Sequence, residues 1–340
     1  MMSKGFFFSS TVLVLGCFLL LNSCRKNTEV ITLSYANFPP DSTFPCIQME
    51  HWKQEVEKRS GGRIKINTFP GGTLLGAKDI FDGVVAGTAD IGNFAMSYQP
   101  GRFPVSEAMD LPHFFANSQT ASRILAELLE KFQPAEFQEV KILTAFTCPP
   151  GVVMSSQKAS TVEDLKGMSL RSSGTLLEPM KLLGSLPIAM PQSDVPDALQ
   201  KGLIKGIVSS AEVLKDMNYA KYCKSVLAAN LPVTSFAVVM NQKKYDSLPE
   251  ELKVILDALY YEQSQWTAKY VDQHVENSLA WAQNEQQVEI TTLPPEVMSS
   301  LRTRLEPIFD SYRKKLTERK IDAEKLLDFI SKHPALGKSE

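Results

Sequence analysis

Hydrophobic and polar residues follow two different periods along this chain, and the changes of period mark its predicted helices and strands. Short runs of β-branched and aromatic residues predict strands, whereas apolar residues three or four positions apart predict helices. In the first half the two kinds of segment alternate. The predicted strands are 29–36, 64–68, 90–94 and 140–147, and the predicted helices are 44–59, 78–86 and 118–132. This alternation predicts an α/β fold with right-handed parallel crossovers.

A second alternating run follows the first and ends near residue 240. Its predicted strands are 168–170, 187–190, 204–208 and 236–240, and its predicted helices are 176–183 and 196–201. A chain of this length exceeds the size at which single cores stop growing, so we expect two lobes. The predicted division is a first lobe at 24–150, completed by return segments from about 241–340, and a second lobe at 151–240.

The segment from Glu250 to Ile290 contains neither proline nor glycine. It follows Ser247-Leu-Pro-Glu250, which has capping-box spacing and a proline in the first turn. About 40 residues at 1.5 Å each would give a helix of roughly 60 Å, which is long enough to reach both lobes. We therefore predict a bridging helix within 247–290, followed by helices at about 295–318 and 322–332.

The first 23 residues predict export. Lys4 provides a positive charge before the apolar run from Phe6 to Leu21, which is too short for an ordinary membrane span. The following Leu21-Asn-Ser-Cys24 resembles a bacterial lipobox, so we expect a signal peptide at 1–23 and lipid on Cys24. This predicts a periplasmic, membrane-anchored lipoprotein. The alternatives are a plain secretory signal, which would give a soluble periplasmic protein, and an uncleaved anchor.

Composition excludes some classes of partner. The 36 Lys and Arg residues nearly balance 38 Asp and Glu residues, without a basic patch, so nucleic acid is not an expected partner. Cys46, Cys148 and Cys223 follow Cys24, and no pair has CxxC spacing. Whether any disulfide forms stays open. We expect a monomer, although the sequence leaves the oligomeric state open.

The sequence offers no catalytic or metal-binding constellation. None of its four histidines has metal-ligand spacing, and there is no GxSxG elbow. The stretch from Gly71 to Lys78 nearly matches a phosphate loop, but Ala77 separates the second glycine from the lysine, and Asp79 follows it. We therefore expect no enzyme activity, no metal and no cofactor.

The run from Thr161 to Arg171 predicts a short capped helix, a stop at Gly167, and a brief strand that ends on the arginine. Ligands of open α/β sheets bind beyond the carboxyl ends of strands. A guanidinium at that position suits a carboxylate or a phosphate. The alternative from this segment alone is an ordinary surface arginine.

Motifs in a fixed order along residues 30–320 resemble the solute-binding proteins of TRAP transporters. They are Ser60–Ile66, Phe69–Gly72, Gly87–Ile91, Asp110–Pro112, Glu163–Arg171, Leu199–Gly202, Gly206–Val208, Met240–Tyr245 and Leu248–Glu250. The resemblance implies a two-lobed, periplasmic-binding-protein-like clamshell with a long helix across both lobes. It also implies capture of a small organic carboxylate and its delivery to membrane-embedded TRAP subunits. The alternatives are a binding protein of an ABC importer and a sensor.

The resemblance implies that Arg171 pairs with the solute carboxylate. Many family members carry an asparagine where Val213 stands, whereas Glu212 is kept, so polyhydroxylated acids become less expected. Further candidates for solute contact, some of which core packing would explain equally well, are Phe38, Phe94, Met96, Met190, Phe236, Arg102, Asn93, Ser209 and Ser235. If several of the apolar residues face the cleft, the solute is a hydrophobic or aromatic monocarboxylate. A C4-dicarboxylate or another small acid is the alternative.

Overall fold

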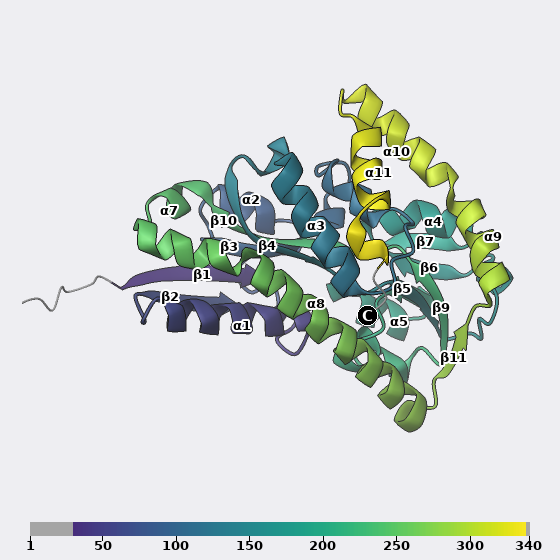
Figure 1. Cartoon of the computed structure of the whole chain (residues 1–340). Helices are drawn as coiled ribbons and strands as arrows, with labels where there is room; N and C mark the ends of the chain where they lie inside the picture. The colour runs from purple at the N-terminus through teal and green to yellow at the C-terminus, as the bar shows by residue number, and fades with distance from the viewer. Residues whose placement is uncertain (1–29, 338–340) are drawn as a thin grey trace, which may run out of the picture.

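The computed structural model describes residues 30–337 and has two lobes, each built on its own sheet (Figure 1). The predicted signal peptide and Cys24 lie outside the described residues. The first sheet has the order β2-β1-β3-β10-β4. Its strands are β1 (Ile31–Asn37), β2 (Ile64–Phe69), β3 (Ile91–Ala95), β4 (Val140–Thr147) and β10 (Ser235–Asn241). Strand β1 pairs in parallel with β2 and β3, which confirms the predicted parallel arrangement.

The second sheet has the order β11-β9-β5-β8-β6-β7. Strand β6 is parallel to both of its neighbours, and β5 is antiparallel to both of its own. The strands are β5 (Gly151–Ser155), β6 (Ser169–Ser172), β7 (Leu186–Ala189), β8 (Gly206–Ser209), β9 (Ser225–Leu231) and β11 (Glu289–Thr292). The sequence did not predict β5, β9 or β11.

Each sheet contains one strand from the part of the chain that we expected in the other lobe. Strand β10 lies antiparallel between β3 and β4, so it belongs to the first sheet, although we expected residues 236–240 in the second lobe. Strand β11 joins the second sheet beside β9. The boundary predicted at 240 therefore moves to the connection between β9 and β10. Apolar periodicity predicts that a segment is a strand, but it does not identify the partner strand.

Helices cover both sheets. In the first lobe, α1 packs against β2, α2 against β3 and β10, and α3 against β4. The helices before the bridging segment are α1 (Phe44–Arg59), α2 (Ile80–Val85), α3 (Ser118–Phe132), α4 (Leu177–Leu182), α5 (Val195–Gln200), α6 (Val213–Asp216) and α7 (Gln242–Asp246).

The long segment forms one unbroken helix, α8 (Glu250–Gln286), as predicted. Its 37 residues give a length of about 55 Å. It packs against α1, α3 and β4 of the first lobe and against α6 of the second, and Figure 1 shows it running diagonally past both sheets. Asp272 of α8 also accepts hydrogen bonds from the first two backbone N–H groups of α3.

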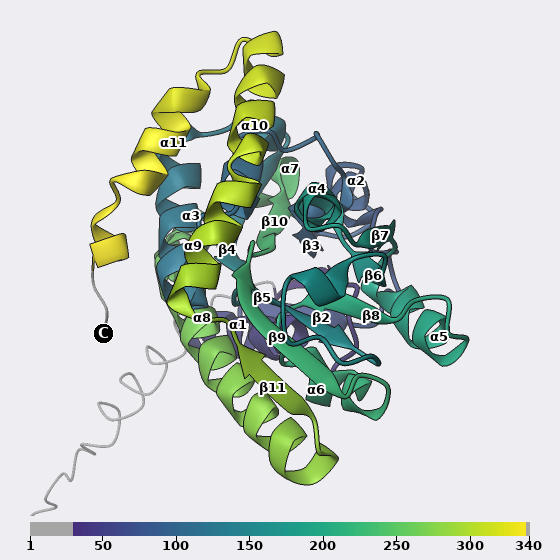
Figure 2. The same cartoon turned by 90° about the vertical axis from the view of Figure 1, so that its right-hand side faces the viewer.

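The segment predicted as one helix at 295–318 is two helices, α9 (Pro295–Leu305) and α10 (Pro307–Glu318). The break is at Pro307, because proline has no backbone N–H and its ring crowds the preceding turn. A last helix, α11 (Ala323–Ser331), is capped by Asp322, whose side chain accepts from the N–H of Lys325. Figure 2 shows α10 and α11 side by side, and α11 also packs against α3. Within residues 30–337 no helix has the length and apolar character needed to cross a membrane.

Candidate functional site

A cavity lies where the chain passes between the two lobes. It encloses about 550 Å³, including the part that is open to solvent. The first lobe lines it with Phe38, Pro39, Thr43, Phe44, Pro45, Tyr98 and Phe236, and the second with Arg171, Ser173, Gln192, Ser209, Glu212, Val213, Asp216 and Met217. Cys148 and Thr234 stand on the two connections between the sheets, where the Cys148 N–H donates to the Thr234 carbonyl at 2.9 Å. The cavity is therefore mainly apolar on one side and polar on the other.

The apolar side is a cluster of aromatic rings held by three elements. Phe38 follows β1, Phe44 begins α1, and Phe236 is the second residue of β10. The ring of Phe236 is nearly parallel to that of Phe38, with centroids 6.3 Å apart, and it meets Phe44 edge to face at 6.2 Å. Behind it, the ring of Phe146 stacks at 5.4 Å. These contacts fix the rings before any ligand arrives, so an apolar or aromatic group meets a preformed wall.

Arg171 is positioned by the segment that the sequence singled out. The Thr161 N–H donates to Asp164 at 2.9 Å and the Asp164 N–H donates to the Thr161 hydroxyl at 3.3 Å, as in a capping box. The turn that they cap is a short 3₁₀ helix, Glu163–Leu165, rather than an α-helix. Gly167 then takes a φ of +72°, and the strand begins. Arg171 is the penultimate residue of this strand, β6.

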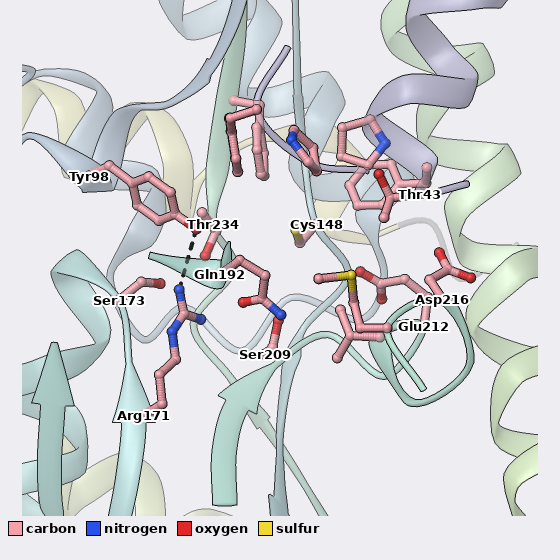
Figure 3. Close-up of a pocket in the computed structure, with 17 residues that line it drawn as sticks. Thr43, Tyr98, Cys148, Arg171, Ser173, Gln192, Ser209, Glu212, Asp216 and Thr234 are labelled. Carbon is pink, nitrogen blue, oxygen red and sulfur yellow. Dashed lines mark hydrogen bonds between the residues drawn. The ribbon is translucent and has the colours of Figure 1, made fainter. Parts of the chain in front are cut away.

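The guanidinium of Arg171 is held from both lobes. Its Nε donates to the carbonyl of Met190 at 3.0 Å, and one Nη donates to the hydroxyl of Tyr98 at 3.3 Å. Figure 3 shows this second bond as a dashed line at one end of the cavity. Arg171 is only 2% exposed, yet it lines the cavity. A charge-assisted bond is strong where solvent is excluded, so this position suits a ligand carboxylate.

The opposite end of the cavity is acidic. Glu212 directly precedes the short helix α6 and Asp216 is its last residue, and Oδ1 of Asp216 lies 2.7 Å from Nε2 of His274 on α8. Burial raises the pKa of the Glu212 carboxyl to about 7, and the negative charge of Asp216 adds to this rise. The hydrogen bond with Asp216 raises the pKa of His274. Burial also raises the pKa of the Cys148 thiol well above its ordinary value, which keeps it protonated.

The structure brings six of the residues suggested by the sequence to the cavity: Arg171, Phe38, Ser209, Glu212, Val213 and Phe236. Met190 takes part through its backbone carbonyl, which orients Arg171, while its side chain packs against the core of the second lobe. The predicted and the observed lining residues agree best on the second lobe. There Ser209 ends β8, which lies beside the strand that carries Arg171.

The remaining candidates have structural partners away from the cavity lining. Phe94 and Met96 are buried in the core of the first lobe. Arg102 forms a bidentate ion pair with Asp82 on the surface. Asn93 donates to Asn37 at 3.0 Å, and the hydroxyl of Ser235 donates to the buried Asp110.

Sequence reasoning missed several polar lining residues. Tyr98 ends a 3₁₀ turn after β3, and Gln192 begins another after β7, so neither has a periodic signal. Asp216 did have a signal, because it stands four residues after Glu212, a spacing that places two helical side chains on one face. In the part of the chain that the structure describes, no group of three or more His, Cys, Asp or Glu side chains is arranged to hold a metal ion.

Comparison with known proteins gives one consistent result. Residues 35–315 match the family described as bacterial extracellular solute-binding protein, family 7 (DctP). A TRAP periplasmic solute-binding protein from Desulfovibrio salexigens DSM2638 is 42% identical, with a TM-score of 0.82 over 91% of this chain and 98% of that chain. Its structure is an open complex with the C-terminus of a symmetry mate in the ligand-binding site.

Two further solved structures contain aromatic acids. A TRAP solute-binding protein from Rhodoferax ferrireducens T118, in complex with copurified benzoate, is 25% identical, with a TM-score of 0.86 over 91% of this chain and all of that chain. A marine metagenome protein specific for aromatic acid ligands, in complex with 3-hydroxybenzoate, is 26% identical, with a TM-score of 0.83 over 90% of this chain and 99% of that chain.

Proposed function

The chain belongs to family 7 of the bacterial extracellular solute-binding proteins, and from this premise we propose that it captures an aromatic or hydrophobic monocarboxylate between its lobes. The observation that carries the proposal is the pairing of one buried guanidinium, that of Arg171, with a wall of aromatic rings in the same cavity. The guanidinium binds the carboxylate, and the rings of Phe38, Phe44 and Phe236 take the apolar body. Similarity to proteins that bind benzoate and 3-hydroxybenzoate supports this choice of ligand class.

The charges around the cavity favour a monocarboxylate over a dicarboxylate. Of the described residues that line it, Arg171 is the only arginine or lysine. A second carboxylate on the ligand would approach Glu212 and Asp216 instead of a cation. Like charges in a desolvated site repel, so succinate or malate would bind at an energetic cost, and this cost grows as pH rises through the raised pKa of Glu212, about 7.

The captured acid is then delivered to a membrane-embedded TRAP-type transporter. The lobes are joined by two short connections and by α8, an arrangement suited to hinge closure around a ligand. Genes for two TRAP membrane subunits next to this gene would support the assignment over an ABC importer or a sensor. We also propose that lipid on Cys24 anchors the protein, which intact mass spectrometry of the mature N-terminus tests.

Isothermal titration against a panel of acids tests the proposal. The panel is benzoate, phenylacetate, indole-3-acetate and hexanoate on one side, and succinate and malate on the other. We expect at least one member of the first group to bind more tightly than either dicarboxylate. Tight binding of succinate or malate, with no binding of the aromatic acids, would contradict the proposed ligand class. Mass spectrometry of the compound that copurifies with the protein provides an independent identification.

A further inference from the structure

The cavity has two chemically different ends. Figure 3 shows the guanidinium of Arg171 at one side and the carboxyl groups of Glu212 and Asp216 at the other, with Gln192 and Ser209 between them. The proposed function uses the first end and the aromatic wall. It gives the acidic end no role.

Each carboxyl group at the acidic end has one oxygen with a partner and one without. Oε1 of Glu212 accepts from the Ser210 hydroxyl at 2.6 Å, and Oδ1 of Asp216 contacts Nε2 of His274 at 2.7 Å. Oε2 of Glu212 and Oδ2 of Asp216 have no hydrogen-bond partner among residues 30–337. Glu212 is 3% exposed and the Asp216 side chain 6%, so both are almost wholly buried.

A buried carboxylate oxygen without a donor is costly, and native proteins pair the great majority of such atoms. Ser210 already donates to the other oxygen of Glu212, and His274 already contacts the other oxygen of Asp216. The two free oxygens belong to residues that line the same cavity. A hydroxyl on the ligand has one hydrogen and would satisfy one of these oxygens, whereas an ammonium group has three and would be able to satisfy both.

We infer that the ligand carries an N–H or O–H donor at the end opposite its carboxylate, and that this donor hydrogen-bonds the free oxygen of Glu212 or of Asp216, or of both when it is an ammonium group. The inference rests on the proposed function, because it requires the ligand carboxylate to bind Arg171. It narrows the ligand class from monocarboxylates in general to bipolar acids such as hydroxy, amino or lactam acids. The apolar middle of the ligand lies against the aromatic wall.

Matched ligand pairs test this directly. Isothermal titration at a pH above 7, where Glu212 is mostly ionised, compares 3-hydroxybenzoate and 3-(aminomethyl)benzoate with 3-methylbenzoate, which has a similar size and no donor. The aliphatic pair 6-hydroxyhexanoate and heptanoate repeats the comparison without a ring. We expect the better donor of each series to bind at least about tenfold more tightly than its matched acid, since hydrogen bonds to charged groups are the strong ones. A preference for the hydroxyl indicates a neutral donor, and a preference for the aminomethyl group indicates a cation.

The variant Glu212→Gln provides a second test of the inference. It keeps the shape of the side chain and removes its charge, so we expect the donor preference to fall to within about threefold. Asp216→Asn serves the same purpose if Glu212→Gln does not fold, as judged by circular dichroism. Glu178→Gln, an exposed glutamate of α4, is the matched control and should keep the wild-type preference.

The possible results separate the two proposals. If the donor-bearing and donor-free acids bind the wild-type protein equally well, this inference is overturned while the proposed function stands. A donor preference that survives unchanged in both Glu212→Gln and Asp216→Asn also overturns it. If none of the benzoates or aliphatic acids binds, the proposed function fails, and the inference fails with it.

Discussion

Replacement of Gly174 by alanine should weaken ligand binding by preventing the two lobes from reaching the approach seen in this structure. Gly174 follows the lining residue Ser173 of the second lobe and faces Ser97 of the first lobe. A Cβ on Gly174 would lie 2.2 Å from the backbone oxygen of Ser97 and 2.4 Å from its Cβ. Because the nearest atom is backbone, a side-chain rotation would not relieve the clash.

The size of the effect follows from this geometry. Ordinary contact begins near 3.4 Å, so the lobes would have to separate by roughly 1 Å at this point. Overpacking of this kind costs about 1–3 kcal/mol, and the cost falls on the arrangement of the lobes seen in this structure. Since apparent affinity scales with the fraction of competent protein, the dissociation constant should rise roughly 5- to 150-fold.

The control is Gly202→Ala, also in the second lobe. Gly174 and Gly202 both have positive φ, +46° and +68°, so alanine brings backbone strain at either position. A Cβ on Gly202 meets nothing within 4 Å. Isothermal titration with 3-hydroxybenzoate and thermal unfolding of both variants give the comparison. If Gly174→Ala is folded and binds as tightly as Gly202→Ala, the lobes do not need this approach and the reasoning is refuted.

Three further predictions concern the wall of the cavity, a buried acid and the bridging helix. Phe38→Leu keeps an apolar side chain but removes a ring, so affinity for benzoate should fall roughly 2- to 10-fold while affinity for hexanoate changes little, as measured by titration. Burial raises the pKa of Asp110 from 3.8 to about 7, so the folded state holds a proton that the unfolded state loses in that range. Asp110 therefore lowers the free energy of unfolding as pH rises between these values, and urea denaturation of Asp110→Asn should show a flatter pH dependence; an unchanged slope would count against it. Asp272→Ala removes the acceptor that α8 provides to the start of α3, and it should lower the free energy of unfolding by about 1–2 kcal/mol. Unchanged hydrogen exchange at the first turn of α3 would show that this cap is dispensable.

Local patterns predicted most of the single elements. The bounds of α1, α3 and β4 agree with the prediction residue for residue, and α8 is continuous because proline and glycine are absent from it. The resemblance to TRAP solute-binding proteins, based on motifs in their order, is confirmed by the family match. These features depend on short-range sequence, where periodicity and breakers act directly.

Features that depend on tertiary partners were not predicted. Nothing in the sequence of β10 indicates that it returns to the first sheet, and β11 is a strand only because β9 lies beside it. The split at Pro307 did have a local signal, since a proline inside a helical pattern ends or kinks the helix.

The same distinction applies to the candidate site. Arg171 was found because a capped turn, a glycine and a short strand determine its place within eleven residues. Arg102 is equally cationic, but Asp82 lies twenty residues before it and forms an ion pair with it on the surface. Side-chain direction at the ends of strands and turns depends on such distant partners. The sequence pattern therefore identified the types of residue that line the cavity more readily than the individual residues.

The central claim is that Arg171 binds the carboxylate of the ligand, and a titration of two arginine variants tests it most directly. Arg171→Ala and its control, Arg102→Ala, are titrated with the tightest-binding acid of the panel, and circular dichroism establishes that both are folded. Removal of one partner from a desolvated charge pair costs roughly 2–5 kcal/mol, so Arg171→Ala should lose a factor of about 30 or more in affinity. Arg102→Ala should bind as the wild type does. Wild-type affinity in folded Arg171→Ala would contradict the account.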